Sequence, residues 1–327
     1  MLRKWLSILA VTVVASGLAP EVSPQEPKPR ILEGLPDHLA RRVESNDKLL
    51  AEANILRPGE TNKAVINAVK VWTSEFPKIR VCFFAGSAAV RAKIAGIANQ
   101  WTIGDAYIPL DFGSLSKPRD CKTNEPNHIR ISFNHAGYWS LVGKDSFFLA
   151  PQDESSMNFE AFDSSPPDES EFRATVLHEF GHALGLQHEH QNPFAKCQNE
   201  FNWDLIYKYL SGPPNNWSKA TTDHNLRAIN TEGLIATAPD KTSIMLYSFS
   251  PEFFLQGADA TCYSPPNTVL SAADKLLIAA LYPKALRDRQ RFAKQMRDEH
   301  NKKLEKVSGQ TKSAIAALID QYLPRPK

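Results

Sequence analysis

A histidine-rich stretch, HEFGHALGLQHEH from residue 178, constrains this chain more than any other feature. It contains four of the nine histidines, so one shared site explains it better than four scattered roles. His178 and His182 are four residues apart, and on a helix both rings project from one face, a turn apart. Gly185 predicts the end of that helix, because glycine adopts the left-handed conformation without steric cost. The chain can then turn back and bring His188 beside the first two rings.

The start of the same helix is also marked. Asp168 precedes Glu171 by three residues, a spacing typical of a capping box, and Pro166-Pro167 stand just before it. We therefore expect a helix from about Glu169 to Leu184.

The spacing of the histidines favours a catalytic zinc site. Three imidazole ligands leave the fourth position of a tetrahedral zinc open for water. The metal lowers the pKa of that water towards about 7, and Glu179, directly after the first ligand, can take its proton as a general base. By average residue usage, HExxH occurs by chance in roughly one chain per hundred of this length, and HExxHxxGxxH is roughly several hundredfold rarer. His190 lies two residues past His188, and we expect it to face away from the metal.

The N-terminus predicts export. A basic start is followed by an apolar run from Trp5 to Leu18, which is shorter than the roughly 20 residues that span a bilayer. We expect a cleaved signal peptide at 1–19 and a secreted protein, extracellular or periplasmic, without stable membrane insertion; an uncleaved anchor is the alternative. The net charge of +2 gives no reason to expect nucleic acid as a partner.

Four cysteines in an exported chain predict two disulfides. Four cysteines allow three pairings. We expect Cys82–Cys121 and Cys197–Cys262, because this pairing keeps each bridge within one half of the region around the histidines.

The pattern of periodicity predicts an α+β fold with a mixed sheet backed by helices. We expect strands at 79–84, 108–112, 128–133, 138–149 and 156–162, and helices at 89–101, 203–210 and 272–281. Residues 20–70 form an N-terminal linker or candidate prosegment, and residues 71–283 form the catalytic domain. Residues 284–327 form a basic helical tail, which we expect to lie on its own domain rather than on an anionic surface.

The histidine string resembles the zinc signature of the metzincin metallopeptidases. Downstream, Ser243-Ile244-Met245-Leu246-Tyr247 is similar to the methionine turn of that clan, in which the methionine is an apolar floor beneath the metal. Glu189, directly after the third histidine, and Tyr247, two after the methionine, match the astacin family. The stretch HEHQNP from His188 looks most like the microbial, secreted astacin-like members.

The resemblance covers about residues 76–283. It implies a zincin-like fold with a twisted mixed sheet and the active-site helix in an N-terminal subdomain, followed by an irregular C-terminal subdomain. It also implies one catalytic Zn²⁺ on His178, His182 and His188, Glu179 as base, and Tyr247 as a donor to the oxyanion. The expected function is a secreted endopeptidase acting on protein or peptide substrates. The alternative is a zinc-bound module that binds proteins or surfaces without hydrolysis.

Two features depart from the animal members of the family. Leu246 stands where they have histidine, and the partner of Glu189, in those members a buried mature N-terminus, is left open here. The sequence shows no convincing inhibitory segment. Cys82 lies within an expected strand, and Asp37 lacks the motif that surrounds the family's inhibitory aspartate.

Overall fold

The protein is described by a computed structural model over residues 33–52, 66–67, 69–102, 106–213, 215–228, 234–235, 238–305 and 310–322. The expected signal peptide at 1–19 lies outside the described residues, as does part of the expected linker. No helix within the described ranges is long and apolar enough to cross a membrane.

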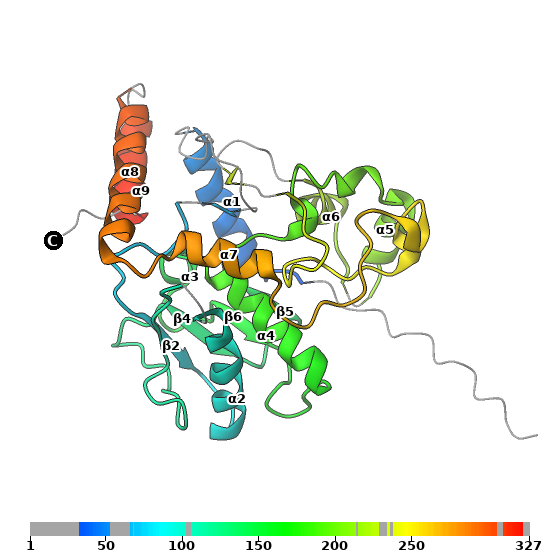
Figure 1. The fold of residues 1–327 in the computed structure, drawn as a ribbon, viewed down its shortest axis with the longest axis horizontal. Helices are drawn as coiled ribbons and strands as arrows, with labels where there is room; N and C mark the ends of the chain where they lie inside the picture. Colours follow the sequence, from blue (N-terminus) through cyan, green and yellow to red (C-terminus); the bar gives the residue numbers. More distant parts are fainter. Residues whose placement is uncertain are drawn as a thin grey trace, which may run out of the picture. The chain divides into compact units, whose positions relative to one another are not determined.

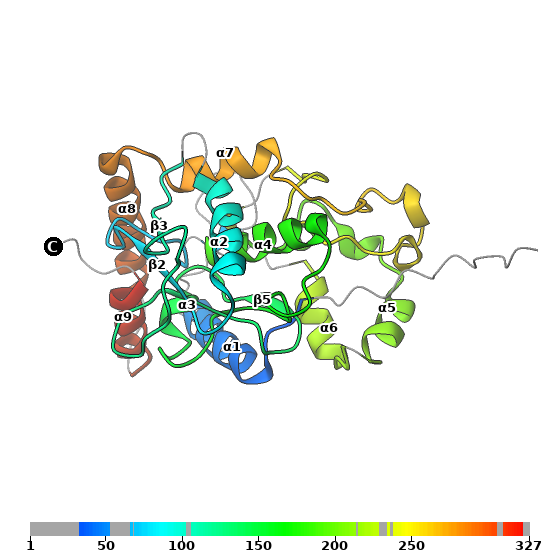
Figure 2. The same cartoon turned by 90° about the horizontal axis from the view of Figure 1, so that it is seen from below.

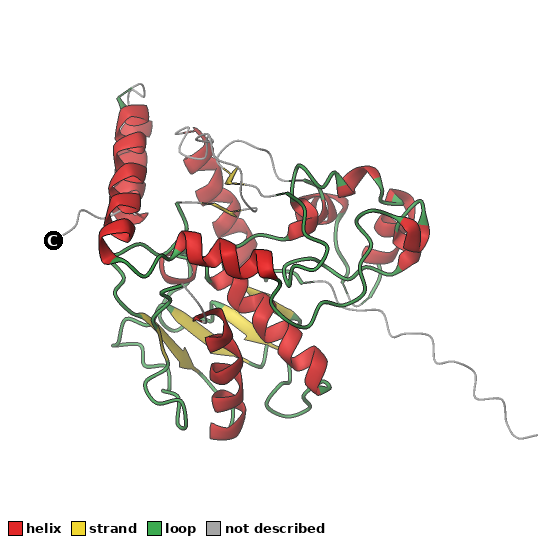
Figure 3. Cartoon of the chain, in the orientation of Figure 1, coloured by secondary structure: helices red, strands yellow, loops and turns green. Residues whose placement is uncertain are grey.

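A five-stranded sheet forms the centre of the fold, with strand order β3-β2-β4-β6-β5. Four strands run parallel, and β5 pairs antiparallel with β6 at one edge (Figures 1 and 3). The neighbouring strands β2 and β4 are almost wholly buried, as expected for a sheet covered on both faces. The strands are β2 (Ile79–Phe83), β3 (Leu110–Asp111), β4 (Ile129–Ser132), β5 (Tyr138–Ser140) and β6 (Met157–Phe159).

One expected strand is wrong in its second half. The segment 138–149 forms β5 and then a short helix, α3 (Asp145–Phe148). The chain turns at Gly143, which has φ +53°, and a Cβ atom there would lie 2.1 Å from the carbonyl oxygen of Lys70. The backbone N–H of Lys144 donates to that same carbonyl at 2.7 Å. This close approach of two backbones ends the strand.

Helices α2 (Ala88–Ala98) and α4 (Glu169–Ala183) pack on the sheet and on each other. Each begins where the sequence predicts: the side chain of Ser87 accepts from Val90 N–H, and that of Asp168 accepts from two N–H groups of the first turn of α4. The apolar face of α4, with Val176 and Phe180 fully buried, forms one core with the sheet. The sheet thereby fixes the helix that carries His178 and His182.

The chain after α4 is largely irregular, as the resemblance implies, and has its own aromatic core around Phe201 and Phe249. Its helices are α5 (Trp203–Leu210), α6 (Lys219–Leu226) and α7 (Ala272–Leu281). The sequence does not predict α6, because its apolar content is low. The expected disulfide pairing is confirmed: Cys82 is bonded to Cys121 and Cys197 to Cys262.

Three helices flank this body. The first is α1 (Asp37–Glu52). Between α1 and β2, the two-residue strand β1 (Ile66–Asn67) pairs antiparallel with β7 (Leu234–Ile235). At the other end of the chain, α8 (Leu286–Leu304) and α9 (Gln310–Tyr322) pack against each other and overlap in the view of Figure 1, and α9 contacts α1 (Figures 1 and 2). The tail therefore packs on the rest of the protein.

His128 gives the fold a measurable pH dependence. Its Nδ1 accepts the backbone N–H of Arg80 at 2.8 Å, which only the unprotonated ring can do. Burial, together with nearby Arg80 and Arg130, lowers the pKa of His128 to about 4. In the unfolded chain this pKa is about 6.5, so the stabilisation is complete above pH 6.5 and is lost as the pH falls towards 4.

Between pH 7 and pH 5, wild-type protein should lose about 2 kcal/mol of unfolding free energy through His128 alone. The variant His128→Asn keeps an amide at the acceptor position and does not titrate in this range. Urea denaturation at the two pH values should therefore show a smaller loss for the variant. An equal loss in both proteins would contradict this assignment.

Candidate metal centre and catalytic residues

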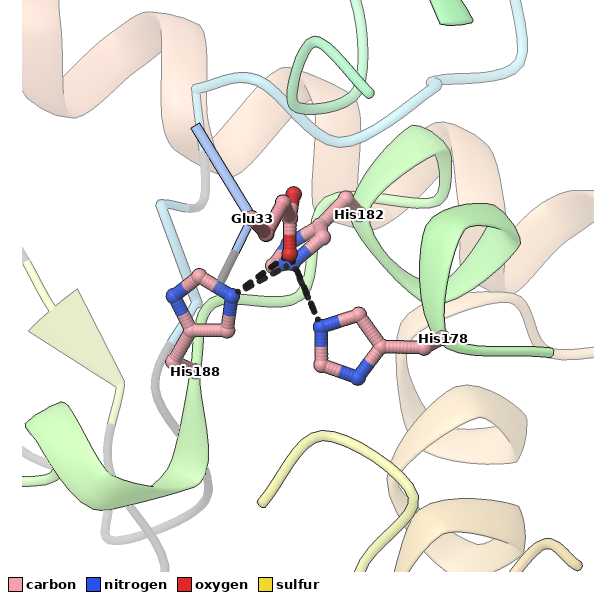
Figure 4. Close-up of side chains that lie close together, drawn as sticks. All are labelled: Glu33, His178, His182 and His188. Atoms are coloured by element: carbon pink, nitrogen blue, oxygen red, sulfur yellow. Dashed lines mark hydrogen bonds and ion pairs between the residues drawn. The ribbon is translucent and has the colours of Figure 1, made fainter. Parts of the chain in front are cut away.

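The three histidines predicted as ligands lie together (Figure 4). His178 and His182 project from one face of α4, and Gly185, at φ +99°, ends the helix so that the chain returns with His188. The Nε2 atom of His182 lies 3.1 Å from that of His178 and 3.0 Å from that of His188. The ligand nitrogens of a tetrahedral zinc ion are about 3.3 Å apart. This spacing suits a single zinc ion.

In each histidine ring, an oxygen atom beside Nδ1 determines which of the two ring nitrogens carries the proton. The Nδ1 atoms of His178 and His182 lie 2.8 Å from the backbone carbonyl oxygens of Ile244 and Leu186. The Nδ1 atom of His188 lies 3.3 Å from the side-chain oxygen of Gln191. Because these oxygens accept hydrogen bonds, each Nδ1 carries the proton and each Nε2 presents a lone pair. Three such nitrogens form a donor set that fits zinc.

A fourth group, which the sequence does not predict, completes the cluster. The Oε2 atom of Glu33 lies 3.1, 3.2 and 2.9 Å from the Nε2 atoms of His178, His182 and His188 (Figure 4). A carboxylate oxygen at this point stands where a fourth zinc ligand would stand.

The segment that carries Glu33 is held on two sides. A Cβ atom on Gly34 would lie 3.0 Å from the indole ring of Trp217, in the irregular subdomain. On the other side, Leu35 packs with α1 against a buried cluster that includes Trp139 and Leu141, at the β5 edge of the sheet. The chain therefore passes between the sheet edge and the irregular subdomain as it crosses the three histidines.

Glu179 is buried beside this cluster, with an exposed fraction of 2%. Burial and the neighbouring carboxylate of Glu33 raise its pKa well above the usual value. Its Oε2 atom has no hydrogen-bond partner among the described residues. A buried carboxylate oxygen without a protein donor suits a group that exchanges a proton with a bound molecule.

Tyr247 brings a hydroxyl to the same point. Its OH donates to Oε2 of Glu33 at 3.3 Å, and its ring lies 4.1 Å from that of His188. Burial, Glu33 and Glu179 raise the pKa of Tyr247 well above 10, so the hydroxyl keeps its proton. It is thus a neutral donor aimed at the oxygen nearest the histidines.

The methionine turn lies directly against α4. Met245 is buried, and its Sδ atom would lie 2.3 Å from a Cβ atom placed on Gly181. The turn is held from α7, since the carboxylate of Asp274 accepts the hydroxyl of Ser243 at 2.7 Å and the backbone N–H of Ile244 at 2.9 Å. Asp274 thereby positions the carbonyl of Ile244 that bonds His178.

Gly181 leads to a matched pair of predictions. Gly181→Ala should lower the free energy of unfolding by about 1–3 kcal/mol, because the new methyl group overlaps the sulfur of Met245. Gly96→Ala, also within a helix but with no atom within 4 Å of the new methyl group, should raise it by about 0.5–1 kcal/mol. Chemical denaturation measures both. A neutral Gly181→Ala would show that Met245 moves aside freely.

Two further residues of the histidine-rich stretch, Glu189 and His190, lie outside the cluster of the three histidines and Glu33. Glu189 is buried and accepts from the side chain of Asn192 at 2.9 Å and from the backbone N–H of Asp240 at 3.2 Å, which answers the question of its partners in this conformation. Burial raises its pKa to about 7. His190 does not join the cluster; its Nε2 lies 2.9 Å from the carbonyl of Asn225, and its ring stacks on Tyr247 at 4.7 Å.

Solved structures resemble this chain, whereas no protein-family model and no curated protein matches it. A structure of myroilysin is 33% identical, with a TM-score of 0.55, over 68% of this chain and 100% of that chain. A crystal structure of myroilysin is 32% identical, with a TM-score of 0.48, over 71% and 96%. High choriolytic enzyme 1, a hatching-enzyme zinc protease from the medaka fish Oryzias latipes, is 20% identical, with a TM-score of 0.41, over 62% and 88%.

The mixed sheet, the helix with two histidines and the third histidine beyond a glycine turn define the class of protein as the metzincin metallopeptidases. Within that class the myroilysin structure decides the family, because it is 33% identical and aligned over its whole length. The chain belongs to the astacin-like zinc metallopeptidases. The expected fold class is confirmed as well.

Proposed function

We propose that this chain is a zinc-dependent endopeptidase that cleaves proteins, and that the conformation with Glu33 on the histidines is its latent form. The observation that carries the proposal is the convergence of three histidine Nε2 atoms beside the buried side chain of Glu179. His178, His182 and His188 would hold the zinc. When bound, the zinc would polarise both a water molecule and the scissile carbonyl.

The other residues act around that metal. Glu179 takes the proton of the attacking water and passes it to the departing amine, a role that its unpartnered Oε2 atom supports. Tyr247 donates its hydroxyl to the oxygen of the former carbonyl, where negative charge develops. Met245 and Gly181 keep α4 against the methionine turn, and Asp274 keeps the tautomer of His178 through Ile244.

Glu33 blocks this chemistry. Its Oε2 atom lies on the fourth side of the histidine cluster and takes the hydroxyl of Tyr247. A zinc ion with four protein ligands has no open position for water, which is the arrangement of structural sites. Hydrolysis therefore requires that Glu33 leave, and the substrate then occupies the space that its segment fills.

The same closed set of four donors favours a second candidate, a zinc-bound binding module that never hydrolyses. The two are separated with the full-length Glu33→Ala variant and an unfolded protein as substrate. The endopeptidase gives cleavage that a zinc chelator stops and added zinc restores. Mapping the cleaved peptides then gives the sequence preference. Zinc-loaded variant protein that leaves the substrate intact would favour the binding module.

The expected compartment follows from the two disulfides and from the N-terminal sequence. Disulfides persist in oxidising compartments, outside the cytosol. Together with the basic and apolar start of the chain, they support secretion, to the periplasm or beyond the cell, with proteins or peptides as substrates.

A further inference from the structure

The C-terminal helix α9 lies across the junction between α1 and the catalytic domain. Buried apolar side chains from three parts of the chain meet there: Leu50 from α1, Val69 from the segment before β2, and Ile315 and Ile319 from α9. The ring of Tyr322, the last residue of α9, joins them and lies 4.9 Å from that of Phe148. Helix α9 thus covers the contact between α1 and the segment before β2, both of which are distant from it in the sequence.

A buried polar network ties the same three parts together. The hydroxyl of Tyr322 donates to Oδ1 of Asp145, in α3, at 2.6 Å. It also accepts the side-chain N–H of Asn46, in α1, at 3.2 Å. Beside it, Nζ of Lys70 lies 2.7 Å from Asp145 and 2.6 Å from Asp47. The amine of Lys144 donates to the backbone carbonyl of Tyr322 as well.

Because this network is buried, the loss of any one hydrogen-bond partner is costly in free energy. Tyr322 and Asp145 are fully buried, and Lys70 is 1% exposed. A buried polar group that loses its partner costs more than the bond contributes, because it cannot regain water. Tyr322 reaches both α1 and α3 from α9, and Lys70 joins the same two helices through Asp47 and Asp145, so the hydroxyl of Tyr322 is one of two polar links between α1 and the catalytic domain.

The position of α1 in turn helps to set the position of Glu33, together with the contact of Gly34 with Trp217. The helix begins at Asp37, four residues after Glu33, and Leu39 and Val43 pack on the cluster that contains Trp139. While α1 stays docked, Glu33 is held beside the histidines at a high effective concentration, and it need not bind tightly by itself. Anything that loosens α1 lowers the time that Glu33 spends there.

We propose that α9 is a clamp whose binding partner is α1, and that Tyr322, by joining Asn46 to Asp145, helps to keep Glu33 on the histidines. The consequence for catalysis rests on the proposed function, whereas the clamp itself is a property of the fold. The two can be measured separately.

The test is hydrogen exchange on the full-length protein with mass-spectrometric readout. Tyr322→Phe removes one hydroxyl and keeps the ring. It should speed exchange in α1 by on the order of tenfold, the effect of about one buried hydrogen bond, while α4 changes by less than about twofold. The matched control is Tyr207→Phe, which removes a hydroxyl that donates to Asp223, between α5 and α6 and outside this junction, and should leave α1 unchanged.

A second variant isolates the coupling. Asn46→Ala removes the α1 side of the contact, so its effect on α1 exchange should overlap with that of Tyr322→Phe, and the double variant should be less than additive. Faster exchange in α1 together with a rise in basal peptidase activity supports both the clamp and the proposed function. Faster exchange with no activity, even in Glu33→Ala, supports the clamp and overturns the function.

Two results would overturn the clamp. One is unchanged exchange in α1 for both variants. The other is equal acceleration in α1 and α4, which would mean that Tyr322 stabilises the whole fold without a specific hold on α1. In either case, chelator-sensitive cleavage by Glu33→Ala would leave the proposed function standing.

Discussion

Replacing Glu179 with glutamine is expected to lower peptidase activity by about 10²- to 10⁴-fold, the usual contribution of a general base. Glutamine has nearly the same size but cannot take a proton. The effect is best measured in the Glu33→Ala background, where the site is open, as kcat/KM on a quenched peptide. Zinc content, measured by elemental analysis, should stay at one ion per chain, because Glu179 is not among the four groups that converge on one point.

The matched control is Glu171→Gln, on the first turn of the same helix. It removes an equivalent charge from α4 at a distance from the cluster and should change kcat/KM by less than about twofold. If Glu179→Gln kept full activity with zinc bound, the assignment of the base would be wrong. If it lost zinc as well, Glu179 would be needed for metal binding.

Replacing Glu33 with alanine is expected to raise the basal activity of the full-length protein by on the order of 10²-fold. A blocker that occupies the site about 99% of the time leaves about 1% of molecules competent, and its removal restores the rest. The contacts of Oε2 with three histidines and with Tyr247 are the physical reason for such occupancy. Initial rates on the quenched peptide, at equal zinc loading, measure the change.

Glu33→Gln separates charge from obstruction, because its amide keeps the size of the side chain but loses the carboxylate. It should give an intermediate gain. Glu44→Ala, an exposed acid on the outer face of α1, should leave the basal rate as it is in wild type. Equal rates for wild type and Glu33→Ala would show that Glu33 does not restrain the enzyme.

The sequence allowed prediction of those parts of the site that are close together in the chain. The helix from Glu169, the glycine turn and the third histidine follow from local spacing, because a helix places residues four apart on one face. The disulfide pairing could also be predicted, because four cysteines allow only three pairings. The contact of Gly181 with Met245 could not be predicted, because it depends on how the methionine turn docks on α4.

Glu33 could not be found in this way. It lies 145 residues before His178 in a polar stretch without periodicity, and its role depends on where α1 docks. The strand expected at 138–149 failed for a similar reason. A short apolar run fits a strand or a helical turn equally well, and the choice was made by a backbone contact with Lys70, which is distant in sequence.

The order of these parts along the chain has a consequence for biosynthesis. A ribosome makes Glu33 and α1 before the three histidines, and domains begin to fold while synthesis continues. On the proposed latent form, the blocking acid is therefore already present when the three histidines first come together, so the site is closed from the time at which it forms. The helix that bears Tyr322 is made after all of them. On the clamp proposal, a chain that folds from its N-terminus is first restrained by Glu33 alone and becomes fully restrained only once α9 has docked.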